Sequence, residues 1–288
     1  MKKTALFIFP VLVLMLYSCN KPESKFEALF NGSNFDGWET YIGVPDHSIN
    51  NIHGLSKNEE GLYTQPIGTN KDPLNVFSIT EIDGEPALHI SGQVYGSFST
   101  LAEHENYHLR LEVKWGDKKW APREDKARNS GILYHGVGKF GKGLEVWKIS
   151  HECQVMENMF GDSYRMGDTY CNITAKANDN GGYIFDPQAP SITFGTGLPA
   201  GKICSKNILN EKPHGEWNVI EVLCLGDVSV HIINGTVNMV NTKSHLMVNG
   251  NEIALTKGVI QLQSEGAEVY YRRMEIRSIN EIPKSYLQ

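Results

Sequence analysis

The chain has 288 residues, a formal net charge of −6, 40% hydrophobic residues and 21% charged residues. This acidic balance excludes the basic footprint of a nucleic-acid-binding protein, so no nucleic-acid partner is expected. Five cysteines are too few for a disulfide scaffold of this length, and their spacing matches no zinc motif.

The N-terminus resembles a bacterial lipoprotein signal. Met-Lys-Lys precedes an apolar run from Ala5 to Leu16, which leads into Leu16-Tyr17-Ser18-Cys19. The run is too short for a convincing membrane span and ends at a small residue suited to signal peptidase. We predict a signal peptide over residues 1–18, a lipidated Cys19, and a polar tether over residues 19–25. The mature chain, of charge −8, is then anchored in the bacterial envelope, in the periplasm or on the outer-membrane surface.

The rest of the chain, residues 26–288, is patterned as β-strands. From Tyr107 to Trp115 apolar and polar residues alternate, as in a strand buried on one face. Gly226-Asp227 and Asn234-Gly235 have the composition of hairpin turns. We predict a single all-β domain, a β-sandwich jelly roll of the concanavalin A-like lectin/glucanase type. Further predicted strands cover Val76–Ile82, Glu85–Ile90, Trp217–Leu225, Val228–Ile233, Val259–Ser264 and Glu268–Ile279.

Residues 161–213 are rich in Gly, Asn, Asp and Pro, and we expect an irregular insertion there that forms a rim or lid. Cys171 and Cys204 flank this insertion and are candidates for a disulfide in an oxidising compartment. Cys153 and Cys224 lie on apolar strand faces and are expected to pack as small hydrophobes. No G-x-S-x-G elbow, P-loop, H-E-x-x-H or EF-hand loop occurs, which excludes several common enzyme classes.

The segment from Ser150 to Asn158 carries the strongest candidates for chemistry. Glu152 and Gln154 share one face of a predicted strand, and Glu157 joins them only if one residue bulges. The spacing resembles the E-x-D-x-x-E catalytic strand of laminarinase- and lichenase-type glycoside hydrolases. Gln154 replaces the central Asp and cannot relay a proton as a carboxylate does. The alternative is that both glutamates are solvated rim residues.

His135 and Arg272 are the other catalytic candidates. On the strand that begins at Arg128, parity places Asn129 and His135 on one side, within reach of Glu152 as base, ligand or substrate contact. Arg272 lies among apolar and aromatic residues and would clamp substrate oxygens or a carboxylate. The alternatives are a hydrogen-bonded histidine at a strand end and an arginine in a structural ion pair.

Sugar-binding candidates are amides and aromatic rings. Gln261 and Gln263 share one strand face, and Gln154, on another strand, is a third candidate amide. Trp120 and Trp147 lie near irregular segments, where an indole can stack on a sugar. A divalent cation is a further possibility that the spacing does not demand, and its ligands would come from Glu152, Glu157, His135 and Asp162.

Short motifs in a fixed order give the chain a family resemblance. It resembles the 3-keto-disaccharide hydrolase family, a family abundant in bacterial lipoproteins, over nearly the whole mature chain. Departures are Arg273, where the family commonly has Asn, and the long insertion of residues 161–213. The motifs are Leu29-Phe30-Asn31-Gly32, Phe35-Asp36-Gly37-Trp38, Asn129-Ser130-Gly131-Ile132, Glu152-Cys153-Gln154-Val155, Gly215-Glu216-Trp217-Asn218, Asn234-Gly235, Ile260-Gln261-Leu262-Gln263 and Tyr271-Arg272.

The resemblance implies a jelly roll and cleavage of glycosides that carry a ketone at sugar C3. A base would remove the acidified C2 proton and the C1 oxygen would leave by elimination. Glu152 or Glu157 would be the base and the other the acid or a ligand, with His135 as auxiliary base and Arg272 as oxyanion clamp. Two alternatives stay open: an ordinary β-glucanase, and a non-catalytic glycan-binding surface lipoprotein.

Overall fold

The computed structural model describes residues 24–50 and 52–287. The predicted signal peptide of residues 1–18, Cys19 and most of the tether of residues 19–25 lie outside this part of the chain. The described residues include no helix with the length and hydropathy that a bilayer crossing requires.

Two antiparallel β-sheets contain the strands of the described residues. The twelve-stranded sheet follows the order β13 (Tyr183–Phe185), β12 (Thr169–Ala177), β18 (Thr236–Val248), β17 (Val228–Ile233), β16 (Asn218–Leu225), β8 (Tyr107–Lys119), β21 (Ala267–Ser278), β5 (Glu85–Ile90), β4 (Phe77–Ile82), with β1 (Glu27–Ala28), β14 (Ser191–Gly195) and β19 (Asn251–Ala254) paired to β21, β12 and β18. The nine-stranded sheet follows the order β15 (Ile203–Cys204), β11 (Ser163–Met166), β10 (Ile149–Met156), β9 (Asn129–Val137), β20 (Lys257–Ser264), β6 (Gly96–Thr100), β2 (Trp38–Ile42), β3 (Gly68–Thr69), with β7 (His104–Glu105) beside β20. A 3-10 turn, η1 (Lys284–Tyr286), lies near the C-terminus.

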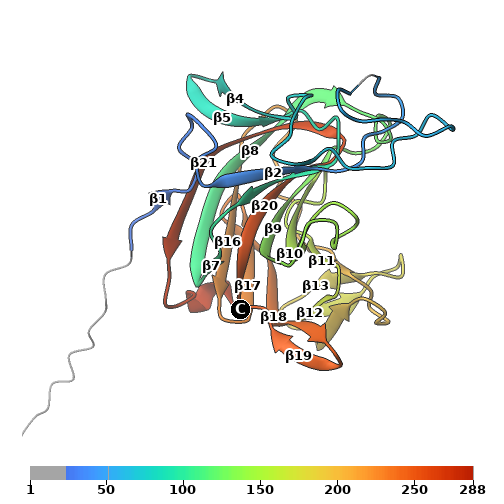
Figure 1. Ribbon diagram of the computed structural model, residues 1–288. Helices are drawn as coiled ribbons and strands as arrows, with labels where there is room; N and C mark the ends of the chain where they lie inside the picture. The colour runs from blue at the N-terminus through green and yellow to red at the C-terminus, as the bar shows by residue number, and fades with distance from the viewer. Residues whose placement is uncertain (1–23, 51, 288) are drawn as a thin grey trace, which may run out of the picture.

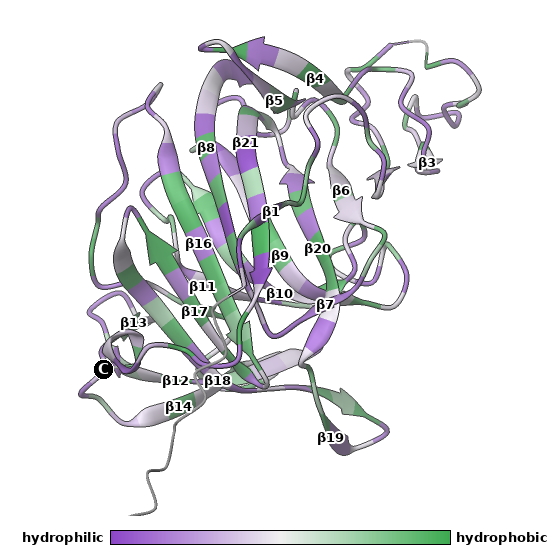
Figure 2. Ribbon diagram, turned by 90° about the vertical axis from the view of Figure 1, so that its left-hand side faces the viewer, coloured by the Kyte–Doolittle hydropathy of each residue, from purple (hydrophilic) through white to green (hydrophobic). Residues whose placement is uncertain are grey.

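The sheets pack face to face as a jelly-roll β-sandwich, which confirms the predicted fold (Figure 1). Apolar and polar residues alternate along β8 and β16 (Figure 2), because successive side chains of a strand point to opposite faces. The predicted strands Glu85–Ile90 and Val228–Ile233 match β5 and β17 residue for residue. The other predicted strands match within a few residues at each end.

An aromatic cluster joins the two sheets near β6. Phe98 is fully buried, stacks on Trp38 with ring centroids 4.4 Å apart, and lies 5.8 Å from Phe77 of the other sheet. Phe30 and Phe35 meet the same ring edge-on. Such aromatic contacts add to the free energy gained from burying apolar area.

Residues 161–213, predicted as an irregular insertion, contain five strands, β11 to β15. Several of these strands are short and separated by Gly- and Asn-rich turns, which obscured their period in the sequence. They enclose a second apolar cluster that includes Phe194 and Met239. Cys171 and Cys204 pack in this cluster as free thiols, so the candidate disulfide is absent among the described residues.

A bulge interrupts β9 at its C-terminal end. Leu133 pairs with Gln261 and Gly136 pairs with Val259, so two β9 residues, Tyr134 and His135, lie opposite one β20 residue. His135 has a φ of 54°, the left-handed value that an inserted bulge residue can adopt. The extra residue breaks the alternation of side chains along β9. His135 therefore does not point to the same face of the sheet as Leu133.

Phe98→Ala should lower the free energy of unfolding by about 3–5 kcal/mol, because it removes a ring surrounded by other rings and leaves a cavity. Urea denaturation followed by tryptophan fluorescence measures the change. The control is Leu101→Ala, one residue beyond β6, where the side chain is 61% exposed and the expected change is within about 0.5 kcal/mol. Equal effects at the two positions would contradict the central place of the cluster.

Candidate functional site

Six polar side chains project from the middle of the nine-stranded sheet, on the side away from the twelve-stranded sheet. Their sequence neighbours Cys153, Ile260 and Leu262 point the other way, into the core between the sheets. We call this surface the polar face. It consists of Asn129 on β9, Glu152 and Gln154 on β10, Gln261 and Gln263 on β20, and Glu265 directly after β20.

Gly131 provides the space in which two of these side chains meet. It lies on β9 opposite Gln154, between the strands that carry Glu152 and Gln263. A Cβ atom at position 131 would clash with Glu152 Oε1 and Gln263 Oε1. The two side chains therefore occupy the volume that a side chain at position 131 would fill.

Glu152 is a buried carboxyl group at the centre of the polar face. Its residue is 2% exposed, and no described residue forms a salt bridge with it. Burial raises the pKa of Glu152 well above its ordinary value, the charge of Glu265 raises it further, and Arg165 opposes the shift. Burial therefore favours the protonated form of Glu152, which can donate a proton.

Glu265 is the second carboxyl group of the site, and the sequence analysis missed it. Burial raises its pKa to about 7, while Arg123 and a hydrogen bond from Asn129 limit the shift. Arg123 Nη1 lies 3.8 Å from Glu265 Oε1. The signal was present in the sequence, because Gln261, Gln263 and Glu265 follow the same period of two.

The two carboxyl groups differ in what surrounds them. Arg123 lies beside Glu265 and opposes the effect of burial on its pKa, whereas burial and the charge of Glu265 both raise the pKa of Glu152. At pH 7 about half of the Glu265 carboxyl groups are ionised, and burial favours the protonated form of Glu152. Two carboxyl groups in different surroundings can take the roles of base and acid.

The amides around this pair have buried polar atoms that form no hydrogen bond with any residue of ranges 24–50 and 52–287. These are Asn129 Oδ1, Gln154 Oε1, Gln261 Nε2 and both polar atoms of Gln263. Each such atom costs about 1–3 kcal/mol unless something hydrogen-bonds to it. Gln261 Oε1, by contrast, accepts from Ser97 Oγ at 3.2 Å. A ligand with several hydroxyl groups matches this mixture of free donors and acceptors.

Aromatic side chains border the carboxyl pair. Burial raises the pKa of the Tyr164 phenol, and the charges of Glu152 and Glu265 add to the shift. Burial and Glu265 raise the pKa of Tyr95 in the same way.

The indole nitrogens of both candidate tryptophans form hydrogen bonds to the backbone: Trp120 donates to Ser91 O at 2.9 Å and Trp147 to Gly96 O at 2.8 Å.

Glu157 does not join Glu152, contrary to prediction. The register of β10 on β9 is continuous from Gln154 to Met156, so no bulge turns Glu157 toward the polar face. Its carboxylate accepts from Arg128 Nη1 at 2.6 Å and from the Arg128 backbone nitrogen at 2.7 Å. Burial alone would raise the pKa of Glu157, but the Arg128 interactions outweigh it and the pKa is lowered. Glu157 is a structural ion-pair partner.

His135 also lies away from Glu152, because the β9 bulge turns it between the sheets. Its ring contacts Tyr107 and Tyr134 edge-on, with centroids 5.9 and 5.6 Å away. Burial lowers the pKa of His135 to about 4. The predicted auxiliary base is therefore a neutral interior histidine.

Arg272 lies on the twelve-stranded sheet, where Nε donates to Glu112 at 2.7 Å and the guanidinium stacks 3.9 Å from the centre of the Trp217 ring. It forms a structural ion pair, the alternative left open by the sequence. Asp162 pairs with Lys206 at 3.3 Å. The candidate cation ligands are thus dispersed, and the described residues contain no group of three His, Cys, Asp or Glu side chains arranged to hold a metal ion.

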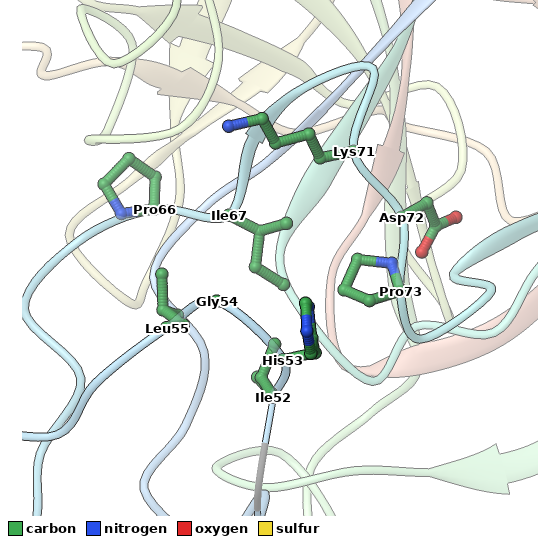
Figure 3. A pocket seen from close by; sticks show the side chains of 9 residues that line it. All are labelled: Ile52, His53, Gly54, Leu55, Pro66, Ile67, Lys71, Asp72 and Pro73. Carbon is green, nitrogen blue, oxygen red and sulfur yellow. The ribbon is translucent and has the colours of Figure 1, made fainter.

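A pocket of about 710 Å³ lies elsewhere, in the loops that follow β2 (Figure 3). Its walls combine aliphatic side chains, among them Ile52, Leu55 and Ile67, with the polar or charged His53, Lys71 and Asp72. None of the six polar-face residues lines it. The pocket lacks a carboxyl pair and an aromatic platform, so the polar face is the better candidate for chemistry on a sugar.

Comparison with solved structures gives distant likenesses. A candidate glycosyl hydrolase of Parabacteroides distasonis is 16% identical, with 88% of this chain and 94% of that chain covered and a TM-score of 0.48. A β-glucanase of Bacillus licheniformis is 10% identical, with 90% and 99% covered and a TM-score of 0.39. The carbohydrate-binding module CBM66 of Bacillus subtilis is 6% identical, with 70% and 92% covered and a TM-score of 0.39.

No curated protein is a significant match to this chain. A family match nevertheless extends over both sheets and includes all six polar-face residues. Residues 25–277 match the 3-keto-alpha-glucoside-1,2-lyase-like domain. The chain belongs to the 3-keto-alpha-glucoside-1,2-lyase-like domain family.

Proposed function

We propose that this protein cleaves glycosides whose sugar carries a ketone at C3, by removing the C2 proton and eliminating the C1 oxygen. The observation that carries the proposal is the carboxyl pair on the polar face, in which burial raises the pKa of Glu265 to about 7 and favours the protonated form of Glu152. The family match supports action on an oxidised glucoside.

The chemistry uses the two carboxyl groups in different roles. A C3 ketone acidifies the C2 hydrogen, and the Glu265 carboxylate takes that proton. As the C1–C2 double bond forms, the C1–O bond breaks and the leaving oxygen takes the proton of Glu152. Water addition across the double bond then completes a net hydrolysis. A positioned acid or base typically contributes about 10²–10⁴-fold to such a rate.

The unpartnered amides supply binding and charge stabilisation. Gln263 Nε2 is a buried donor without a partner in the part of the chain that the structure describes, and it can donate to the enolate oxygen that develops at C3. Preorganised donors of this kind cost no reorganisation during the reaction. Gln154 and Asn129 would accept from sugar hydroxyl groups through their free oxygens. The Arg123 guanidinium lies beside Glu265 and favours its ionised form. In this scheme Gln263 has the oxyanion role that the sequence analysis predicted for Arg272.

A glycan-binding role without turnover is the second candidate, because the same free amides would bind any sugar ring. It differs from the proposed enzyme in needing no acid or base. The β-glucanase alternative is weakened by the Arg128 ion pair, which removes Glu157 as a second carboxylate for Glu152.

Glu265→Gln and Glu152→Gln should each lower kcat/KM for a C3-oxidised glucoside by about 10²-fold or more, since each removes one proton-transfer group. Product release from matched oxidised and unoxidised glucosides measures this. Glu157→Gln is the control and should stay within about threefold of the original protein. Saturable binding without cleavage of either substrate would contradict the enzyme and favour the binding module.

The raised pKa of Glu265 also predicts a pH-dependent stability. Folding raises the pKa of the Glu265 carboxyl group from 4.5 to about 7, so the folded state binds this proton more tightly than the unfolded state. The free energy of unfolding is therefore highest below pH 4.5 and falls as the pH rises through 7. Glu265→Gln should therefore gain stability relative to the original protein between pH 4 and pH 8, by up to about 3 kcal/mol at about 1.4 kcal/mol per pKa unit.

Urea denaturation at the two pH values measures this gain. Glu157→Gln serves as the opposite control, because the lowered pKa of Glu157 means that its ion pair stabilises the fold at pH 8 and less at pH 4. The same sign for both variants would show that Glu265 is not held above its ordinary pKa.

We also propose that the protein is anchored in the bacterial envelope through lipidated Cys19, which the lipobox-like sequence Leu16-Tyr17-Ser18-Cys19 supports. Cys19→Ala should move the protein from the membrane fraction to the soluble fraction when it is expressed with its own N-terminus in a bacterium that processes lipoproteins. Immunoblots of the two fractions measure the change, and equal membrane association of both forms would contradict the anchor.

A further inference from the structure

The connection between β9 and β10 is far longer than joining two antiparallel neighbours requires. A hairpin of two residues would suffice, yet residues 138–148 leave the sheet and cross its outer side. We call this segment the strap. Its contacts reach β20, β6 and β2, strands that lie one, two and three places beyond β9 in the sheet.

Two side chains fasten the strap to β2. The ring of Phe140 stacks on Tyr41 with centroids 4.7 Å apart and planes 6° from parallel. The Lys148 ammonium lies 4.5 Å from the centre of the Phe140 ring and 3.1 Å from Glu39 Oε1. The outward-facing residues of β2, Glu39 and Tyr41, are thus both engaged by the strap.

Trp147 and Lys148 fasten the strap over the middle of the sheet. Trp147 is 2% exposed, packs with Leu133 and Met166, and donates to the Gly96 carbonyl on β6. The Lys148 backbone nitrogen donates to Gln261 Oε1 at 3.1 Å. Val146 packs so closely on Gly43, the residue after β2, that a Cβ at Gly43 would lie 3.0 Å from Val146 Cγ2.

The strap therefore divides the outer side of the sheet into two parts. Along β9 the outward residues are Asn129, Gly131 and Leu133; the first two lie beside the carboxyl groups and the third lies under Trp147. The Tyr95 ring, 6.1 Å from Trp147 and inclined by 25°, stands at the boundary. Further sugar units bound toward β2 would have to occupy space that the strap already fills.

We propose that the strap restricts this protein to glycosides in which the oxidised sugar is a terminal unit, with the rest of the substrate directed away from β2. The inference rests on the proposed function and specifies its substrate class. A stacked aromatic pair, an ion pair and a buried indole hold the strap in place. A longer substrate that displaced the strap would lose more free energy from these contacts than it would gain from binding. A polysaccharide chain threaded across the sheet is excluded, whereas short glycosides and chain ends are accepted.

The test compares two C3-oxidised oligosaccharides of equal length, one with the oxidised glucose at a terminus and one with it in the interior. The original protein should cleave the terminal form with a kcat/KM at least about 10²-fold higher, a ratio typical of steric exclusion. In Phe140→Ala/Lys148→Ala, which removes both β2 anchors but leaves Trp147 and the carboxyl pair, this ratio should fall at least tenfold. Cleavage of the terminal form should stay within about threefold.

The matched control is Lys57→Ala, which removes an ammonium 4.9 Å from the centre of the Tyr63 ring in a loop away from the strap. In this control, the ratio of kcat/KM for the terminal form to kcat/KM for the interior form should equal that of the original protein. Equal cleavage of terminal and interior forms by the original protein overturns the role of the strap and leaves the proposed function intact. Cleavage of neither form overturns the proposed function and this inference with it. The comparison on the original protein decides the outcome even if the double variant does not fold.

Discussion

The alternation of side chains along an antiparallel strand governs how this protein is built. Each strand of the nine-stranded sheet gives one set of residues to the core and the other set to the outer side. The inner set, such as Ile132, Leu262 and Phe98, packs against the second sheet and fixes the backbone. A rigid backbone in turn fixes the outer set, so the carboxyl and amide groups are positioned by strands rather than by loops.

The buried polar groups of the polar face lower the stability of the fold, which indicates that they are kept for function. Among the described residues, Glu152 is buried without a salt-bridge partner and several amide atoms around it have no hydrogen-bond partner. A core built for stability alone would not contain such groups. The large apolar interface between the sheets supplies the stability that tolerates them. The strap contributes as well, because Val146 and Trp147 pack with Leu133 and Met166 in an apolar cluster on the outer side of the sheet.

Most of the fold and half of the site were predictable from the sequence. The period of two located β5 and β17 to the residue. It also placed Glu152 with Gln154 on one strand face and Gln261 with Gln263 on another, but not the two strands side by side. It failed at His135, because a bulge adds a residue that the period cannot register, and at Glu157, because the expected bulge is absent. Arg272 failed for another reason: its partners, Glu112 and Trp217, come from strands distant in sequence. Glu265 was within reach, one period beyond Gln263.

The lack of a side chain at Gly131 is a requirement of the site. Any residue larger than glycine at this position would displace either Glu152 or Gln263, because both fill the space above its backbone. A related chain can keep both glutamate and glutamine at these positions and still lose the arrangement through a single methyl group at a third. When homologous sequences are compared for this arrangement, a glycine at position 131 is therefore as informative as the glutamate at 152 and the glutamine at 263.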